Sequence, residues 1–468
     1  MKRPGSQRRR GVHGMHWKGR VCGFWFLAAG RKWRLVEPKT GSRREECTSE
    51  DQKKATGCIL SRTRESKMEI PFKSFLSRRW LIAIIAAAAL SFAAKVAISV
   101  NTYGSTDALI WETNLQEFHH NGALALYRTG TILRKAGVDY HSAIFNHPPF
   151  MFHMLSWWSW LSDVSGLPLR FWLRFTCTVA DLVSVVLLAG ILSQSHVPFQ
   201  PAVLFMLAAS PVSVMISGFH GNTDPIMVAF LLLSLYLLET ERPLWLAGAA
   251  LGMAMNIKIV PAIFTPTIFL FLRGRQRREF FGGAAGMFII GSLPMIAQDP
   301  LLIGTHVFAY TPQTGMWGLS RFVFALGAGA QLQVYARVGK VALLSLLVVS
   351  SIWMNARKRK PPLPVQCGLL ALIFLALTPG FGVQYLAWIV PWTSVLTFRQ
   401  ALAFQATSTS FLLSYYNRGS HGFPWYLANS LTTPVWYGSV IFLGLLCWLT
   451  ICFITIFFAR KLKIMVDG

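Results

Sequence analysis

The sequence predicts an all-α polytopic membrane protein, and three observations on composition and length lead to this fold class. Hydrophobic residues make up 53% of the 468 residues and charged residues only 14%, whereas a soluble domain carries about 25% charged residues. Several apolar stretches approach or exceed the roughly 20 residues that an α-helix needs to span a bilayer. The chain also has 17 Trp and 34 Phe, more than a disordered chain would hold. These observations argue against a water-soluble globule and against a disordered protein.

The first predicted span covers about residues 80–98 and follows Arg78 and Arg79. By the positive-inside rule, this basic pair places the start of the span in the cytoplasm. The polar loop that follows, residues 99–147, should then lie outside the membrane. It is long enough to carry short helices on the membrane surface.

Apolar segments and short connections alternate along the rest of the chain. The segments cover residues 149–161, 171–193, 200–217, 223–238, 244–272, 280–297, 337–354, 363–378, 383–398, 400–415 and 435–458. The stretch 244–272 is too long for one simple span, so we expect a break near Lys258 and Pro261. The expected bundle therefore has about 11–13 transmembrane helices.

Clusters of Lys and Arg mark the cytoplasmic connections. They lie at residues 273–278, 357–360 and 460–463. The loop 298–336 should consequently be external. Counting spans from both ends leaves the parity between residues 161 and 272 open, and with it the side that His220 and Asp224 face.

The net charge of +26 is unevenly distributed, because residues 1–67 hold 18 basic and 6 acidic residues. This head has no amphipathic period, and its apolar run at 21–29 is too short to span a membrane. We interpret it as a disordered tail or a mis-assigned start, with translation beginning at Met68; a functional basic domain is the alternative. Residues 68–468 form the transmembrane domain. No soluble domain offers a basic face for nucleic acid, which is therefore not an expected partner.

The sequence points to no cofactor and to no metal centre. Three of the seven cysteines lie in the head, and the other four lie in apolar segments without metal-ligand spacing. Walker, GxGxxG and HExxH motifs are absent, so nucleotide-driven transport and zincin chemistry lose support. The first loop has no Asp-x-Asp pair, the usual hallmark of metal-assisted sugar transfer, and the metal requirement stays open.

Asp107 is the acidic residue that most strongly indicates a functional site, because it lies about nine residues beyond the first span. A carboxylate held at the membrane surface, beside the aromatic Trp111 and below a large external loop, can act as a general base. An ordinary solvated loop acid, or a helix N-cap, is the alternative reading.

A second constellation lies within and between the spans. Residues 218–225, Gly-Phe-His-Gly-Asn-Thr-Asp-Pro, place His, Asn and Asp in a Gly-rich break between apolar helices. A helix N-terminus there would attract an anion such as phosphate, although a plain capped turn is equally possible. Arg170, Arg174 and Asp181 fall on roughly one helix face, as a structural salt bridge or as ligand contacts.

Two isolated cations and one polar pair complete the candidates. Lys258 lies within an apolar stretch and needs an anionic partner or a polar cavity. Arg321 lies in the second external loop, and two cations with a helix terminus would clamp a phosphate. Gln384 and Tyr385 begin another span with groups that could bind a sugar, although Tyr is also an ordinary interfacial anchor.

In their order along the chain, these motifs resemble the GT-C integral-membrane glycosyltransferases, which use a polyprenyl-phosphate sugar as donor. The matching parts are Gly104-Ser-Thr-Asp107 to Trp111 and His147-Pro-Pro-Phe150. They are similar to an acid-to-Trp stretch and Tyr-Pro-Pro-Leu of the lumenal glucosyltransferases of asparagine-linked glycosylation. His220-Gly-Asn-Thr-Asp224 and Lys258-Ile-Val-Pro261 are similar to Arg-Gly-Asn and Lys-Ile-Tyr-Pro of the mannosyltransferase of GPI-anchor synthesis. The resemblance covers roughly residues 78–400.

The resemblance implies a GT-C-type bundle and a mechanism. Asp107 would deprotonate an acceptor hydroxyl, which attacks the anomeric carbon in one displacement with inversion. Lys258 and Arg321 would stabilise charge on the departing polyprenyl phosphate. The residues expected to bind the phosphate or sugar are Lys258, Arg321, His220, Asn222, Asp224, Gln384 and Tyr385. Glu112 and His147 would support the loop or the acceptor.

The expected partners are the polyprenyl-phosphate sugar, membrane lipids, and a glycan, lipid or protein acceptor. The transferred sugar would be a hexose, mannose or glucose. A bacterial inner membrane, with the site facing the non-cytoplasmic side, is the expected location. A transporter or flippase of lipid-linked sugars would explain the spans and intramembrane charges, but it leaves the long loop with its acid unexplained. A non-catalytic scaffold leaves Asp181 and Lys258 unexplained.

Overall fold

The computed structural model describes residues 76–130, 132–135, 138–141, 145–195, 200–308, 313–420, 422–428 and 437–467. All of them belong to one unit of the chain, Ile70–Gly468. The predicted extension over residues 1–67 lies outside the described residues.

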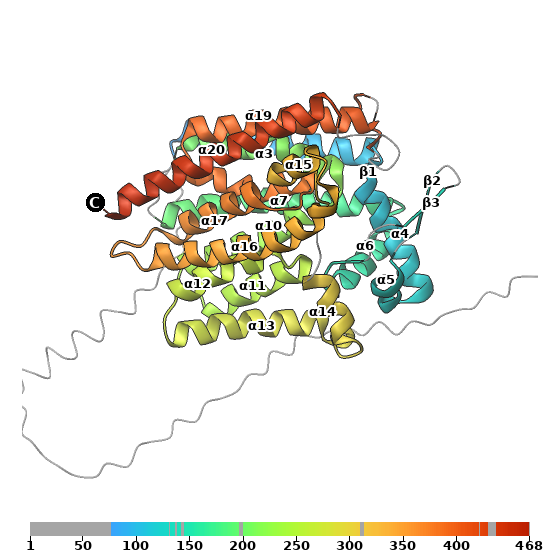
Figure 1. Cartoon of the computed structure of the whole chain (residues 1–468), viewed down its shortest axis with the longest axis horizontal. Helices are drawn as coiled ribbons and strands as arrows, with labels where there is room; N and C mark the ends of the chain where they lie inside the picture. Colours follow the sequence, from blue (N-terminus) through green and yellow to red (C-terminus); the bar gives the residue numbers. More distant parts are fainter. Residues whose placement is uncertain are drawn as a thin grey trace, which may run out of the picture. The chain divides into compact units, whose positions relative to one another are not determined.

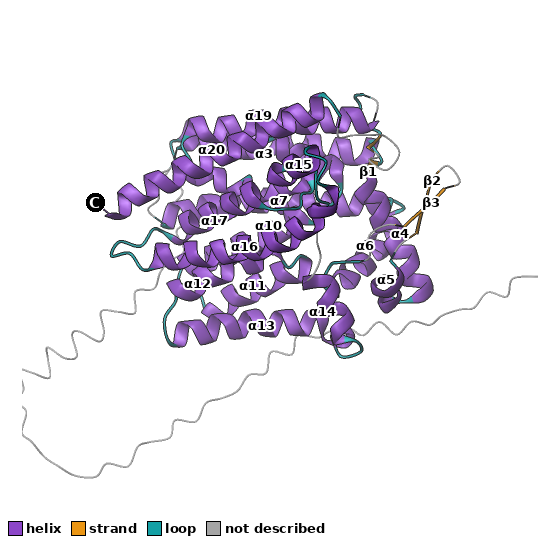
Figure 2. Cartoon of the chain, viewed as in Figure 1, coloured by secondary structure: helices purple, strands orange, loops and turns teal. Residues whose placement is uncertain are grey.

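Helices form nearly all of the described chain (Figure 2), which confirms the predicted all-α fold class. The helices that run along the bundle in Figure 1 are α3 (Arg78–Asn101), α7 (Leu169–Gln194), α10 (Asp224–Glu239), α11 (Leu244–Ile257), α12 (Thr265–Phe271), α13 (Arg275–Ile296), α16 (Gly329–Asn355), α17 (Leu363–Leu377), α19 (Phe398–Ser420) and α20 (Ser439–Asp467). Within the described ranges, six helical stretches are by themselves long and apolar enough to cross a membrane. The predicted 11–13 spans also include shorter helices such as α11, α12 and α17, so that number stays a prediction.

Two of the predicted spans are interrupted helices. Helix α11 ends at Ile257, Lys258 is extended, and the 3₁₀ turn η2 (Val260–Phe264) leads into α12, which confirms the break expected near Lys258 and Pro261. The segment predicted over 383–398 is built from η3 (Val383–Tyr385), α18 (Leu386–Ile389) and η4 (Pro391–Val395). Backbone groups freed by such breaks must be satisfied by neighbouring helices or line a cavity.

The long loop after the first span contains ordered elements, as the sequence predicts. It carries helix α4 (Thr106–Asn121), helix α5 (Ala123–Thr129) and an antiparallel hairpin of β2 (Ile132–Lys135) and β3 (Val138–His141). A short parallel pair joins β1 (Gly104–Ser105) to β4 (Leu427–Ala428). Helices α4, α5, α6 (Met151–Ser165) and α14 (Pro300–Phe308) all lie at one end of the bundle, on the right in Figure 1. We call this the loop end.

The predicted cytoplasmic markers lie at the opposite end. The α12–α13 and α16–α17 connections and the C-terminal part of α20 are on the left in Figure 1. They carry the basic clusters at residues 273–278, 357–360 and 460–463. The two ends of the bundle therefore differ in charge, as the positive-inside rule requires of two membrane faces.

A π-helical segment carries the candidate histidine. After α8 (Pro201–Ala208) and α9 (Pro211–Ser213), the chain winds as the π-helix η1 (Val214–His220). Gly221 ends it in the left-handed region at φ 79°, and a Cβ there would lie 3.1 Å from that of Ala108. Glycine is thus required both by the backbone conformation and by the approach of α4. Pro225 then starts α10 in its first turn.

Helices α11 and α13 approach each other through glycines. A Cβ on Gly248 would lie 1.8 Å from the carbonyl oxygen of Phe280, and one on Gly252 would lie 2.3 Å from that of Ala284. These two glycines are spaced as in the small-xxx-small motif, which lets helix backbones pack closely in lipid. This packing fixes the helix that ends at Lys258.

Candidate functional site

Asp107 lies in the first turn of α4, at the loop end of the bundle. The N-cap of this helix is Ser105, whose Oγ accepts a hydrogen bond from the backbone N–H of Asp107 at 3.1 Å and donates one to the carbonyl oxygen of His220. The alternative reading of Asp107 as the N-cap is therefore wrong. Its carboxylate is left free for other contacts.

Arg174 of α7 holds the backbone that leads to Asp107. Its side chain is fully buried. Its guanidinium donates to the carbonyl oxygens of Ser99 and Thr102 at 2.8 Å each, and to the Thr102 hydroxyl at 2.9 Å. These carbonyls belong to the last turn of α3, whose orphan acceptors are thus satisfied by a charged donor. Arg174 is a structural residue that fixes the start of the loop.

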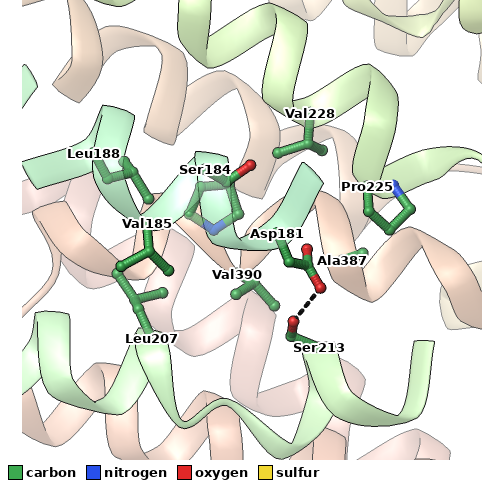
Figure 3. A pocket seen from close by; sticks show the side chains of 11 residues that line it. Asp181, Ser184, Val185, Leu188, Leu207, Ser213, Pro225, Val228, Ala387 and Val390 are labelled. Atoms are coloured by element: carbon green, nitrogen blue, oxygen red, sulfur yellow. Dashed lines mark hydrogen bonds between the residues drawn. The ribbon is translucent and has the colours of Figure 1, made fainter. Parts of the chain in front are cut away.

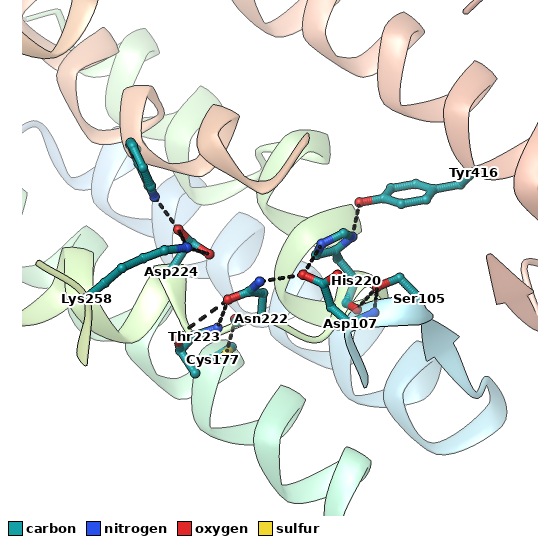
Figure 4. Close-up of polar contacts among 10 residues, drawn as sticks. Ser105, Asp107, Cys177, His220, Asn222, Thr223, Asp224, Lys258 and Tyr416 are labelled. Carbon is teal, nitrogen blue, oxygen red and sulfur yellow. Dashed lines mark hydrogen bonds and ion pairs between the residues drawn. The ribbon is translucent and has the colours of Figure 1, made fainter. Parts of the chain in front are cut away.

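The Asp107 carboxylate meets the Gly-rich break of residues 218–225 (Figure 4). Its Oδ2 lies 3.2 Å from His220 Nε2, and Asn222 Nδ2 donates to the same oxygen at 2.5 Å. On the far side of the imidazole, the Tyr416 hydroxyl lies 3.1 Å from His220 Nδ1. These contacts resolve the parity that the sequence left open, because they place His220 at the same end of the bundle as Asp107.

The surroundings of Asp107 keep it ionised. Burial by itself raises the pKa of a carboxyl, but the proximity of His220, the hydrogen bonds from His220 and Asn222, and the charge of Lys258 together lower the pKa of Asp107 below its ordinary value of 3.8. The side chain keeps 29% of its surface exposed. Asp107 is therefore an accessible carboxylate at neutral pH.

A second cluster joins Lys258 to Asp224 and to two aromatic rings. Lys258 Nζ lies 2.9 and 3.1 Å from the two carboxylate oxygens of Asp224, and Trp388 Nε1 donates to Oδ1. The rings of Tyr385 and Trp388 stack at 4.0 Å between centroids, with Nζ 5.3 and 5.5 Å from them. Because Asp224 has no exposed surface, any effect of it on a ligand must pass through its partners Lys258 and Trp388.

Glu112 and His147 hold the loop near this site. Glu112 accepts hydrogen bonds from Arg170 at 3.0 Å and from the Tyr103 hydroxyl at 2.7 Å. Burial and the Glu112 hydrogen bond raise the pKa of Tyr103 to about 12. His147 donates from Nδ1 to the carbonyl oxygen of Ile257 at 3.1 Å. Burial, reinforced by the charge of Lys258, lowers the pKa of His147 to about 3, so its ring is neutral.

The other predicted cation, Arg321, packs on an aromatic ring. Arg321, on α15 (Gly318–Ala325), lies with its guanidinium 5.3 Å from the centroid of the Phe324 ring. Lys258 pairs with Asp224, whereas Arg321 packs on the Phe324 ring, so the clamp of a phosphate by both cations stays a prediction. Gln384 lies in the short turn η3, beside Tyr385.

Asp181, on α7, forms a separate cluster in the bundle. Its Oδ2 accepts hydrogen bonds from Lys95 Nζ at 2.8 Å and from the hydroxyls of Ser213 and Ser217. Figure 3 shows Asp181 and Ser213 on the wall of a small cavity that Pro225 also lines. Asp181 therefore makes an intramembrane salt bridge with a neighbouring helix, as one reading of the sequence proposed, whereas Arg170 pairs with Glu112.

Sequence reasoning missed Tyr416, Trp388, Ser105 and Lys95. Lys95 could have been found, because a lone cation in an apolar helix requires a partner. Tyr416 and Trp388 carried no local signal, because aromatic residues are common in spans and at membrane interfaces. Across the described residues, no group of three or more His, Cys, Asp or Glu side chains is placed to hold a metal ion.

The apolar helical bundle and its match to a family model identify a membrane glycosyltransferase of the GT-C type. The model of glycosyltransferase family 87 matches residues 145–379, half of the chain, and the protein belongs to that family. The matched region includes His220, Asn222 and Lys258, whereas Asp107 lies before it. A comparison with curated proteins gave no significant match.

Proposed function

We propose that this glycosyltransferase moves a hexose, mannose or glucose, from a polyprenyl-phosphate donor to a lipid, glycan or protein acceptor on the non-cytoplasmic face of the membrane. The observation that supports this proposal is the pairing of an exposed, ionised carboxylate, Asp107, with a neighbouring cation set on an aromatic stack. The carboxylate suits an acceptor hydroxyl, and the cation and rings suit a sugar phosphate.

The transfer needs one base and no strong acid. Asp107 accepts the proton of the acceptor hydroxyl while that oxygen forms a bond to the anomeric carbon. The bond from the anomeric carbon to the phosphate oxygen breaks, and its electron pair leaves with the polyprenyl phosphate. Because phosphate is already a good leaving group, no general acid is needed to protonate it. The single displacement inverts the anomeric centre.

Lys258 is the residue of choice for the leaving phosphate. Its ammonium group has three N–H donors, and its side chain is 13% exposed even while it contacts Asp224. A charge held in a low-dielectric site stabilises a developing anion more strongly than it would in water. Tyr385, whose buried ring stacks on Trp388, is a candidate for contact with the hexose. Arg321 and Gln384 remain candidates for donor contacts.

The side of the membrane on which transfer takes place follows from the charge of the two ends of the bundle. The basic clusters lie at the end of the bundle opposite Asp107. By the positive-inside rule that end faces the cytoplasm, so the carboxylate faces the other side. A bacterial inner membrane is the location that we propose.

A reconstituted transfer assay tests the proposal. Purified full-length protein in lipid vesicles is given radiolabelled polyprenyl-phosphate mannose or glucose together with a lipid extract as acceptor. We expect label to move to a new product with the wild-type protein and not with Asp107→Asn. Asp163→Asn is the matched control, because Asp163 is an exposed acid in α6 and should leave transfer unchanged.

Two outcomes would contradict the proposal. Transfer that is equally fast in Asp107→Asn would remove the carboxylate from the mechanism. Movement of the donor between leaflets without any transfer would instead support the flippase alternative.

A further inference from the structure

Both hydrogen-bond donors of the Asp107 cluster meet the same carboxylate oxygen. His220 Nε2 and Asn222 Nδ2 both contact Oδ2, at 3.2 and 2.5 Å. Among the described residues none donates a hydrogen bond to Oδ1, and the side chain is 29% exposed. One oxygen of this carboxylate is thus held by the protein, and the other is free.

The buried hydroxyl of Tyr416 decides which ring nitrogen of His220 carries hydrogen. Tyr416 is fully buried on α19, so its O–H needs an acceptor. The acceptor within reach is His220 Nδ1, at 3.1 Å. If Nδ1 accepts, the ring hydrogen is on Nε2, where it points at the Asp107 carboxylate. The opposite tautomer would set a nitrogen lone pair against a carboxylate oxygen.

We infer that Tyr416 and His220 are positioning residues that fix Oδ2 of Asp107, so that Oδ1 is the atom that takes the proton of the acceptor. This inference rests on the proposed function and refines it. His220 and Asn222, which the sequence assigns to donor binding, here position the base Asp107. Tyr416 acts only through the tautomer of His220 and touches no substrate.

The arrangement joins parts of the chain that are far apart in sequence. Asp107 comes from α4, His220 and Asn222 from the turn between η1 and α10, and Tyr416 from α19. Two other titratable groups interact with Asp107: the charge of Lys258, at the end of α11, acts on Asp107, and the charge of Asp107 acts on His147, before α6. Within the described residues, the groups that contact Oδ2 are His220 and Asn222, and neither Lys258 nor His147 does so.

A double-variant cycle in the transfer assay tests the inference. The four proteins are wild type, Tyr416→Phe, His220→Gln and the double variant, each compared by kcat and by the KM for polyprenyl-phosphate sugar. A glutamine amide can donate to Oδ2 as Nε2 does, but it has no tautomer to be set. We expect Tyr416→Phe to lower kcat about 3- to 10-fold in the wild-type background, as for one lost hydrogen bond. We expect no further loss in the His220→Gln background and no change in KM.

His220→Asn provides a second comparison that does not depend on folding of the Tyr416 variant. Its shorter amide cannot reach Oδ2, so kcat should fall further than in His220→Gln. Tyr236→Phe is the matched control, since Tyr236 lies near the C-terminal end of α10, about three turns along the helix from Asp224.

The same experiment separates this inference from the proposed function. Equal losses from Tyr416→Phe in both backgrounds would show a structural role and overturn the inference, as would an unchanged kcat in the wild-type background. In either case transfer by the wild type would leave the proposed function standing. Absence of transfer by the wild type would instead contradict the function itself.

Discussion

Two carboxylates flank the π-helical segment η1 and are used in opposite ways. Asp181 contacts the start of the segment, through Ser213 and Ser217, and Asp107 contacts its end, through His220 and the following Asn222. Asp181 is paired with a full charge, Lys95, whose side chain is only 6% exposed. Asp107 is contacted by the His220 ring and the Asn222 amide, and 29% of its side chain is exposed.

The difference shows what makes a membrane carboxylate available for chemistry. An ion pair buried in the bundle satisfies its acid and ties helices together, and removing one partner leaves an expensive unpaired charge. A carboxylate that is kept ionised by hydrogen bonds to one oxygen and by a more distant charge still has its second oxygen available to accept a proton. A π-helix between them is a rare element that is found often at functional sites.

The largest effect on turnover is expected at Asp107. Asp107→Asn removes the base, and general-base catalysis contributes roughly 10²- to 10⁴-fold. We expect a loss of kcat in that range, with donor binding and thermal unfolding in detergent close to wild type. A large loss of thermal stability in this variant would contradict the distinction drawn between the two acids.

The largest effect on stability is expected at Asp181. Asp181→Ala leaves Lys95 buried and unpaired, which costs about 3–5 kcal/mol. Replacing both partners by apolar residues, in Lys95→Met with Asp181→Leu, should recover most of the unfolding free energy. Unfolding in detergent at increasing denaturant would measure both. If the double variant were as unstable as the single one, the pair would not be the source of the loss.

An intermediate effect is expected at the Lys258–Asp224 pair, because this pair contributes both to stability and to the proposed chemistry. Lys258→Met should lower kcat/KM for the polyprenyl-phosphate donor about 10- to 100-fold, in keeping with the 1.5–3 kcal/mol of a charged hydrogen bond. It also leaves Asp224 buried without its cation. Adding Asp224→Asn should restore stability but not activity. Recovery of activity in this double variant would show that Lys258 is only a structural partner.

The smallest effect is expected from pH. The pKa of Asp107 lies below 3.8, so its carboxylate is present above that pH and the base is lost only as pH falls through the lowered value. The pKa of His147 is about 3, so its ring stays neutral as well. Between about pH 5 and 8, the rate of the chemical step should therefore show no limb from either group. A single-turnover rate that fell within this range would show that a group other than Asp107 or His147 titrates in the chemical step.

Part of this fold and site could be predicted from sequence because the signals are local. Apolar length gives the helices, and Lys and Arg clusters give their direction. The break at Lys258 could be placed because an intramembrane cation and a proline are both marked by residue type. Asp107 could be singled out because so few acids follow Met68.

What only the tertiary structure decided is how those residues pair. The parity of the middle segments was settled by the contact between Asp107 and His220, which are 113 residues apart. The partners of Asp181 and Asp224 came from α3, η1 and α18, and Tyr416 came from α19. Sequence determines which groups are too costly to leave alone in a membrane, because that cost depends on the group itself. Which partner satisfies each group depends on helix packing, which no local pattern encodes.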